Sequence, residues 1–361
     1  MLTEERREAI LRVVERRGSV TVKDLSEEMG VSTVTVRQDV RELAGKGLLA
    51  RVHGGAMSPA AARAHAPKTS GGPRPAAPPG RSVGLVVPPG GYYYAEVISG
   101  VQDAARALEV RVVLAVSGET LPENQEQVRQ LLAAGAEGLL LMPHPGLGLP
   151  EEVETWLGGL DVPAVLMERR ARPPAGATEQ VASHHAYGAQ LAVRHLAGLG
   201  HDRVALVARI ESPNTPLIQE GYAAAVAELG LVTGLEYPVT TTEGGDAVAG
   251  RFEAVVRAAA AGGFRAALVH NDIDAIALVG LLRARGLRVP EDVAVVAYDD
   301  EVAELADTPL TAVAPPKHAV GAWALDLLIR RLEDPSRPVA DVLLRPVLNV
   351  RASSGPTVGD Q

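Results

Sequence analysis

Side chains suited to binding nucleic acid are concentrated in residues 32–41, which read Ser-Thr-Val-Thr-Val-Arg-Gln-Asp-Val-Arg. An arginine can donate two hydrogen bonds to guanine and a glutamine can pair with adenine, so Arg37 and Gln38 are candidates for reading bases. Hydroxyl groups near a helix N-terminus can bond phosphates or base edges. The full candidate set is Ser32, Thr33, Thr35, Arg37 and Gln38, then Arg41, Lys46 and Arg51 for backbone phosphates, and His53.

Three helical patterns position these side chains. Thr3 can cap the first helix, and residues 21–24 resemble a capping box at the start of a short second helix. Ser32 can cap a third helix, in which Val36, Val40 and Leu43 share one face. Residues 48–52 then alternate briefly before His53-Gly54-Gly55. This order predicts a winged helix-turn-helix over residues 1–57, although a small helical bundle with a solvated polar face would show the same periodicity.

A different pattern begins at residue 82, where short apolar strands alternate with amphipathic helices up to about residue 350. Such alternation indicates a doubly wound α/β fold with a parallel sheet covered on both faces. Because about 270 residues exceed one such unit, we expect two lobes. Lobe 1 is expected at about 82–180 and 313–336, and lobe 2 at about 181–312 and 337–350, with residues 319–332 forming a long helix on the first lobe.

The two patterned regions are separated by residues 58–81, which contain six prolines, four basic residues and no acidic residue. Proline interrupts helices and sheet ladders, so we expect a flexible linker, with an ordered interdomain loop as the alternative. Residues 351–361 are expected to be a disordered tail. The net charge of −9 conceals an asymmetry, because residues 1–57 carry +1, the linker +4 and the remainder −14. DNA contact is therefore expected at the N-terminal end.

Residues 7–56 resemble the DeoR-type winged helix-turn-helix, most specifically in the ending Arg51-Val-His-Gly-Gly-Ala. Residues 82–350 instead resemble the LacI/GalR sensor domain, which has a type 1 periplasmic-binding-protein fold. The matching stretches include Gly221-Tyr-Ala-Ala-Ala, His270-Asn-Asp-Ile-Asp-Ala, residues 289–300 (Val-Pro-Glu-Asp-Val-Ala-Val-Val-Ala-Tyr-Asp-Asp) and Pro309-Leu-Thr. The resemblance implies a ligand cleft at the carboxyl ends of the strands of both lobes.

Candidate ligand residues follow from this resemblance. Three tyrosines, Tyr92 to Tyr94, come after the first predicted strand, where an aromatic ring can stack on a sugar or base; the alternative is that they pack beneath the lobes. The family uses an aspartate at the position of Asp272 to accept bonds from ligand hydroxyls, unless here it only caps a helix. The full set is Tyr92, Tyr93, Tyr94, Arg169, His184, His185, Ile218, Asp272 and Asp299.

Two positions depart from the family. His184 and His185 stand where an Asp-Asn pair is common, and Ile218 stands where an arginine is common. Loss of that arginine removes a bidentate donor for carboxylates or phosphates, which favours a less acidic ligand or a pocket that binds none.

The sequence offers little support for an enzyme, a metal-binding protein, a membrane protein or a secreted protein. There are no cysteines, no His pair at helical spacing with a carboxylate, and no Walker or nucleophile-elbow motif, so we expect no metal, no cofactor and no enzyme activity. No apolar run is long enough for a membrane span. The N-terminus lacks a hydrophobic signal core.

The sequence predicts a cytoplasmic homodimeric regulator, expected to act as a repressor, that binds double-stranded operator DNA and a sugar-like effector. A single reader contacts too few base pairs for genomic specificity, which is why a dimer is expected. Two alternatives stay open. The sensor domain could serve only for dimerisation, or the chain could be a solute-binding protein.

Overall fold

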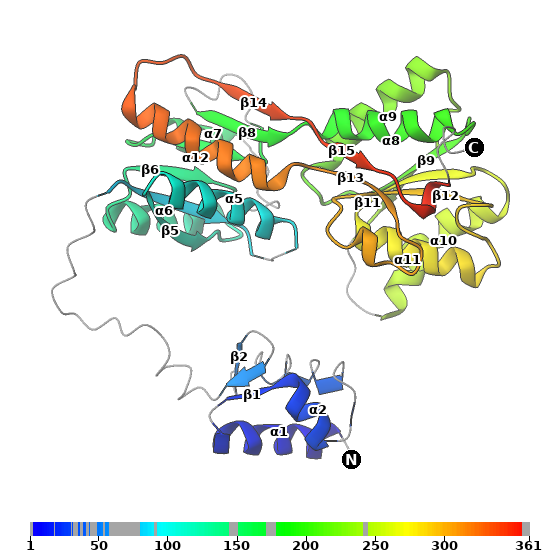
Figure 1. Cartoon of the computed structure of the whole chain (residues 1–361), viewed down its shortest axis with the longest axis horizontal. Coiled ribbons are helices and arrows are strands. Elements are labelled where there is room, and N and C mark those ends of the chain that lie inside the picture. The colour runs from blue at the N-terminus through cyan, green and yellow to red at the C-terminus, as the bar shows by residue number, and fades with distance from the viewer. Residues whose placement is uncertain are drawn as a thin grey trace. The chain divides into compact units, whose positions relative to one another are not determined.

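The computed structural model describes residues 3–17, 19–29, 31, 35–36, 39–40, 43, 49–52, 55–57, 80–89, 92–143, 151–170, 178–240 and 245–355. The chain divides into two compact units, Met1–Pro78 and Pro79–Gln361 (Figure 1). The expected linker falls almost wholly outside the described residues, since only Gly80 and Arg81 of it are described. None of the described helices is both long and apolar enough to cross a membrane.

The first unit combines helices with a small sheet. Its elements are α1 (Thr3–Arg17), β1 (Ser19–Thr21), α2 (Val22–Met29), β2 (Ala50–Val52) and β3 (Gly55–Met57). The sheet has the antiparallel order β1-β3-β2. Residues 35–36, 39–40 and 43 are helical, and the apolar residues of the first and third expected helices meet in one core: Ile10, Val13, Val14, Val36, Val40 and Leu43.

Asp39 is a buried acidic residue of the segment 35–43, whose described residues are helical. Its carboxylate is only 1% exposed and accepts bonds from Arg6 Nε at 2.6 Å and Arg7 Nε at 2.9 Å, both on α1. Burial alone would raise the pKa of Asp39, but the two guanidinium groups hold it below its ordinary value. Asp39, Val36 and Val40 therefore fasten this segment to α1.

The second unit contains two six-stranded sheets, each with helices on both faces (Figure 1). In lobe 1 the sheet order is β14-β8-β7-β6-β4-β5, and all neighbouring strands are parallel. Its elements are β4 (Ser82–Val87), α5 (Tyr94–Ala107), β5 (Arg111–Val116), α6 (Leu121–Ala133), β6 (Gly138–Leu141), α7 (Glu151–Gly158), β7 (Ala164–Met167), β8 (Glu179–Ser183), α12 (Lys317–Glu333) and β14 (Asp341–Leu344).

Lobe 2 has the sheet order β10-β9-β11-β12-β13-β15, in which only the last pair is antiparallel. Its elements are α8 (His185–Gly198), β9 (Val204–Arg209), α9 (Thr215–Leu229), β10 (Glu236–Val239), α10 (Gly245–Ala260), β11 (Ala266–His270), α11 (Asp272–Ala284), β12 (Ala294–Tyr298), η2 (Ala303–Leu305), β13 (Thr311–Ala314), β15 (Val347–Asn349) and η3 (Ala352–Ser354). The expected two-lobed, doubly wound fold is confirmed.

Alternating residues of each central strand fill two separate cores. Val83, Leu85 and Val87 of β4 pack with α5 and α12, whereas Val86 packs with α6 and α7 on the opposite face. Successive side chains of a strand point to opposite faces, so a continuous apolar run is needed where both faces are covered. This is why the short apolar runs of the sequence mark these strands correctly.

Two glycines bring α5 and α12 into direct backbone contact. A Cβ added at Gly321 of α12 would lie 2.0 Å from the carbonyl oxygen of Val97, and one added at Gly100 of α5 would lie 1.9 Å from that of His318. Neither position has room for any side chain. The two helices therefore form one rigid layer on lobe 1.

The chain crosses between the lobes three times, and the third crossing differs from the expected one. β14 pairs with β8 in lobe 1, with Asp341 opposite Gln180, so the chain leaves lobe 1 at residues 345–346 and not near residue 337. Residues 337–350 were expected to lie in lobe 2, so β14 was assigned to the wrong lobe. Its sequence, Asp-Val-Leu-Leu, is that of a short apolar strand, which hydropathy alone cannot assign to one lobe or the other.

The expected disordered tail is wrong for residues 351–355. Arg351 donates to both carboxylate oxygens of Asp300, at 2.6 and 3.1 Å, and Ser353 Oγ donates to the Val295 carbonyl at 2.6 Å. Ser353 and Ser354 are both buried. Hydrogen bonds, which hydropathy does not register, hold this segment in lobe 2. Residues 356–361 lie outside the described part of the chain.

Candidate functional site

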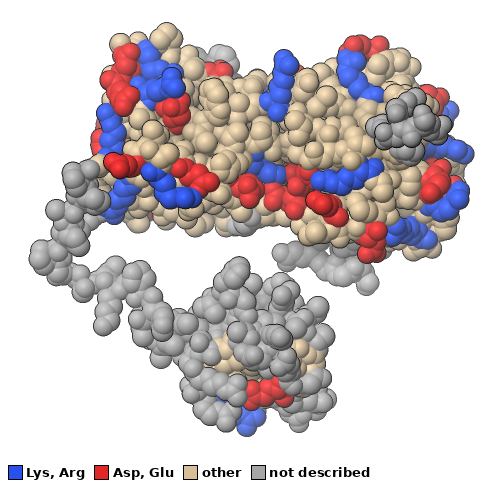
Figure 2. Space-filling view, viewed as in Figure 1, with Lys and Arg blue, Asp and Glu red and all other residues tan. Residues whose placement is uncertain are grey.

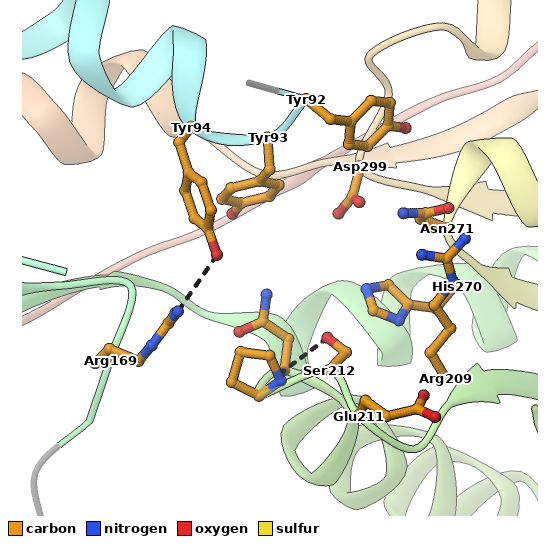
Figure 3. Close-up of a pocket in the computed structure, with 12 residues that line it drawn as sticks. Tyr92, Tyr93, Tyr94, Arg169, Arg209, Glu211, Ser212, His270, Asn271 and Asp299 are labelled. Carbon is orange, nitrogen blue, oxygen red and sulfur yellow. Dashed lines mark hydrogen bonds between the residues drawn. The ribbon is translucent and has the colours of Figure 1, made fainter. Parts of the chain in front are cut away.

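A pocket of about 220 Å³ lies between the two lobes. Figure 3 shows its walls, with three tyrosines and Arg169 on the lobe 1 side and Arg209, His270, Asn271 and Asp299 on the lobe 2 side. The remaining lining residues are Glu211, Ser212, Pro213 and Asn214. Sites for drug-sized ligands usually measure ~300–1,000 Å³. This smaller pocket therefore suits a molecule of about one sugar ring or one base.

Every wall of the pocket follows the carboxyl end of a parallel strand. Tyr92 and Tyr93 lie between β4 and α5, and Tyr94 begins α5. Arg169 follows β7, Arg209 ends β9, His270 ends β11, and Asp299 follows β12. In open α/β sheets the loops at these strand ends form a crevice where the strand order reverses. β4 lies between β5 and β6, and β9 lies between β10 and β11, so both sheets reverse at the pocket.

Asp299 is a buried carboxyl group with an uncommitted oxygen. It is 3% exposed, and its Oδ1 has no hydrogen-bond partner among the described residues. Burial, reinforced by the negative charge of Asp272, raises the pKa of Asp299 to about 7, although Lys317 opposes this. Near neutral pH this side chain can therefore either donate or accept a hydrogen bond in the pocket.

His270 supplies a neutral ring beside Asp299. Burial, with smaller effects from His185 and Arg209, lowers the pKa of His270 to about 3. Its Nδ1 is buried without a partner in the described structure, and its ring meets the edge of Tyr298 at 5.6 Å. His270 thus offers one unused polar atom and no charge.

Tyr92 joins the two lobes by a hydrogen bond. Its hydroxyl donates to Asp272 Oδ2 at 3.1 Å, and the same carboxylate accepts the backbone N–H groups of residues 300, 301 and 302 at 3.2, 2.6 and 3.1 Å. Asp272 is fully buried and does not line the pocket. In this structure Asp272 holds Tyr92 and the 300–302 loop together, and its expected role in accepting ligand hydroxyls stays a prediction.

A second link between the lobes is buried at the first crossover. Glu168, after β7, accepts bonds from Tyr93 Oη at 2.9 Å and from Ser183 Oγ at 2.7 Å and N at 3.0 Å, and its Oε2 lies 3.4 Å from His185 Nε2. His185 Nδ1 lies 3.2 Å from the Tyr298 hydroxyl. Burial alone would raise the pKa of Glu168, but His185 and Ser183 hold it below its ordinary value.

Three expected ligand residues lie away from the pocket. His185 belongs to the buried link just described, and His184 caps α8 by accepting the Tyr187 N–H at 3.2 Å. Ile218 is fully buried in the core formed by α8, α9 and the lobe 2 sheet. Of the candidate set, the structure brings Tyr92, Tyr93, Tyr94, Arg169 and Asp299 to the pocket, and ligand contact by them stays a prediction.

The structure adds seven pocket residues that sequence reasoning did not single out: Arg209, Glu211, Ser212, Pro213, Asn214, His270 and Asn271. All of them end or follow strands that the sequence did predict. The sequence signal that could have identified these residues was therefore their position at or just after the end of a predicted strand.

Most candidate DNA-binding residues lie outside the described part of the chain: Ser32, Thr33, Arg37, Gln38, Arg41, Lys46 and His53. Thr35 is helical and half-buried, and the backbone of Arg51 lies in β2, paired with Ala56. Their contacts with DNA stay predictions.

Comparison with known proteins covers both units. Residues 6–61 match the DeoR-like helix-turn-helix domain, and residues 193–354 match the periplasmic binding protein-like domain. The HTH-type transcriptional repressor PurR of Vibrio vulnificus (strain CMCP6) is 27% identical over 349 residues, which span 92% of this chain and 97% of the relative. The chain is a helix-turn-helix transcriptional regulator. The expected joining of a DeoR-type reader to a periplasmic-binding-protein-like domain is thereby confirmed.

The regulator is also similar to the ribose operon repressor of Escherichia coli (strain K12), with 28% identity over 73% of this chain and 78% of the relative. A solved complex of the transcriptional regulator CelR with cellobiose has a TM-score of 0.65 and 25% identity, and covers 89% of this chain and 90% of that one. The lac repressor dimer on operator shares the fold, with a TM-score of 0.64 at 23% identity over 77% of this chain and 95% of that one. These relatives are regulators and not enzymes.

Proposed function

We propose that the regulator is a cytoplasmic repressor that binds operator DNA through residues 1–57 and that a small molecule in the inter-lobe pocket controls its DNA affinity. The pocket carries this proposal, because its walls come from both lobes. A ligand held there contacts both lobes and stabilises one relative arrangement of them over another. The cellobiose bound to CelR and the size of the pocket favour a ligand with a sugar-like ring.

The DNA-contact proposal is tested with a binding site selected from random duplexes. Arg37→Ala is expected to weaken binding to that site by ~1–3 kcal/mol and to relax the preference at one base pair, because a bidentate base contact is lost. Arg51→Ala is expected to weaken binding to all duplexes alike and to reduce the salt slope by roughly one, because a phosphate contact is lost. Fluorescence anisotropy at two salt concentrations measures both effects.

A chain that begins at Ser82 serves as the control for these measurements. It keeps every described helix and strand of the second unit and lacks the proposed reader, so it should not bind the selected site. Retained specific binding would show that the reader has been assigned to the wrong residues. The alternative of a sensor domain that binds no ligand gains support if none of the sugars and sugar derivatives tested changes the affinity for the operator.

We further propose that the regulator is a homodimer that associates through an apolar patch on lobe 2. Ile273 and Ile276 lie one turn apart on α11 and are 48% and 36% exposed, and Leu305 of the adjoining η2 is 81% exposed. Grouped exposed apolar side chains mark interaction sites on otherwise polar surfaces. Acidic and basic side chains are interspersed over much of the face of this unit shown in Figure 2, a surface unlike a basic DNA-binding patch.

The dimer proposal predicts a specific loss of association. Leu305→Asp is expected to weaken dimerisation by ~2 kcal/mol or more, which is at least about 30-fold, because a charge must be buried where an anchoring side chain was. Val232→Asp is the matched control, since Val232 is exposed just after the end of α9, outside the patch. Sedimentation velocity over a concentration series measures both variants. Equal dimerisation of the two variants would place the interface elsewhere.

A further inference from the structure

Two guanidinium groups face the pocket from opposite lobes. Arg169 lies on the lobe 1 wall beside Tyr94, and Arg209 lies on the lobe 2 wall beside Asn271 (Figure 3). Arginine forks suit planar anionic groups such as carboxylates and phosphates. The net charge that the pocket presents to a ligand therefore depends on how far neighbouring residues neutralise each guanidinium group.

Arg169 is a buried cation with only neutral partners among the described residues. It is 6% exposed, and it donates from Nε to the Pro143 carbonyl at 3.2 Å, from Nη1 to the Glu168 carbonyl at 2.7 Å and from Nη2 to the Tyr94 hydroxyl at 3.3 Å. No carboxylate of the described structure lies within ion-pair distance of it. The segments 144–150 and 171–177, which flank this region in sequence, contain neither Asp nor Glu.

Arg209 belongs to a cluster with one cation in excess. Its Nε and Nη2 donate to the two oxygens of Asp274 at 2.6 and 2.9 Å, and Arg251 Nη1 donates to the same carboxylate at 3.1 Å. One buried carboxylate is thus shared by two guanidinium groups. The Nη1 group of Arg209 takes part in neither bond to Asp274 and remains able to donate toward the pocket.

Two acidic residues on the pocket wall oppose this positive charge. Glu211 lies just after β9, where it already has an interaction of its own. Burial raises the pKa of Asp299 to about 7, so near pH 7 it carries only part of a negative charge, and its protonated form can donate a hydrogen bond to an oxygen of the ligand. The charge that lacks a counter-ion is therefore mainly cationic, and it is greatest at Arg169. A buried cation without a counter-ion is unfavourable, so an incoming anion gains more there than in water.

We propose that the effector carries a carboxylate or phosphate group on a ring-sized, hydroxylated body, and that this anionic group binds Arg169. Arg209 on the opposite wall adds a second positive charge to the same pocket. The inference rests on the proposed function for the existence of an effector. The proposal reverses the expectation of a less acidic ligand. That expectation arose because Ile218 stands where the family commonly has an arginine, and Arg169 and Arg209 supply guanidinium donors in its place.

The first experiment measures the thermal stability of the full-length protein at constant ionic strength, with chloride replaced by acetate, sulfate or phosphate. Wild type is expected to gain several degrees more than Arg169→Gln in at least one of these anions. Arg330→Gln is the matched control, because Arg330 lies on the exposed face of α12 and its side chain pairs with Asp326 of the same helix. General salt effects act on the control and the wild type alike. Equal gains in wild type and Arg169→Gln would overturn the inference.

The second experiment uses wild type alone, so it decides the matter even if Arg169→Gln fails to fold. Calorimetry compares glucose and galactose with their uronates and their 6-phosphates. An anionic member is expected to bind at least tenfold more tightly than its neutral parent. Preference for uronates identifies the carboxylate, and preference for 6-phosphates identifies the phosphate. A neutral sugar that binds as tightly as its anionic counterparts would overturn the inference, and if that sugar also changes operator affinity the proposed function stands.

Discussion

Replacing Asp299 with asparagine should make the ligand-free protein more stable at alkaline pH than the wild type. The pKa of this carboxyl is about 7 in the folded protein against an ordinary value of 3.8. One pKa unit corresponds to ~1.36 kcal/mol, so ionising Asp299 in the folded state lowers stability by ~4 kcal/mol. Asparagine has nearly the shape of the neutral acid, and it tolerates the positive φ of 97° at this position.

The sign of the pH dependence follows from the raised pKa. The folded protein binds this proton more tightly than the unfolded chain, so the stabilisation is complete below the ordinary pKa and is lost as the pH rises toward about 7. The advantage of Asp299→Asn over wild type should therefore grow by ~2–3 kcal/mol between about pH 5 and about pH 9. Urea unfolding, followed by circular dichroism, measures it.

Asp307→Asn provides the matched control for this substitution. The Asp307 side chain is 96% exposed, so its replacement should change stability by less than ~0.5 kcal/mol at any pH. A pH-independent difference between Asp299→Asn and wild type would mean that Asp299 does not titrate in this range. A stabilised Asp299→Asn that no longer responds to its ligand would indicate that the pocket keeps a costly group for function.

Removing the Glu168 side chain should destabilise the second unit by ~3–5 kcal/mol. Glu168→Ala leaves Tyr93 and Ser183 without the acceptor that they share and removes the carboxylate beside His185, in a place where both Glu168 and His185 side chains are 1% exposed. Glu168→Gln should be milder, because its amide retains one oxygen for these donors. Exposed Glu152 of α7 is the control, and Glu152→Ala should have little effect.

The pH dependence of Glu168→Gln has the opposite sign to that of Asp299→Asn. The pKa of Glu168 is lowered in the folded protein, so its contribution is present above the ordinary value of 4.5 and is lost as the pH falls through the lowered one. The gap between wild type and Glu168→Gln should therefore narrow in acid. A cost below ~1 kcal/mol for Glu168→Ala at neutral pH would show that the lobes do not depend on this link.

The predictable part of the fold is the part that hydropathy encodes. Runs such as Val83–Val87 predict their strands because both sheet faces are covered by helices. β8 shows the limit, since its sequence Glu-Gln-Val-Ala-Ser is polar yet wholly buried. Glu179 at its start is buried against Arg331 and Arg337, which lie more than 150 residues later. No local pattern reveals such a pairing.

The same limit applies to the pocket. Tyr92 to Tyr94 were identified because three aromatic residues in one loop are conspicuous in a chain with few aromatics. Arg209 and His270 were missed because, in sequence, an arginine or histidine after a strand looks like any solvated residue. The contacts of Asp272 could not be predicted for a related reason, because its partners Tyr92 and the 300–302 amides come from two distant segments.

The contact between α5 and α12 has a mechanical consequence. Side chains in contact can accommodate a displacement of one helix by changing rotamer. The backbones of α5 and α12, which are in contact at Gly100 and Gly321, cannot adjust in this way. α12 begins immediately after the chain crosses from lobe 2, and Lys317 at its start donates to the Asp299 carbonyl there. A shift of Asp299 would therefore pull on the end of α12, and α5 must move with it. α5 begins at Tyr94, so the motion would return to the pocket from its opposite wall.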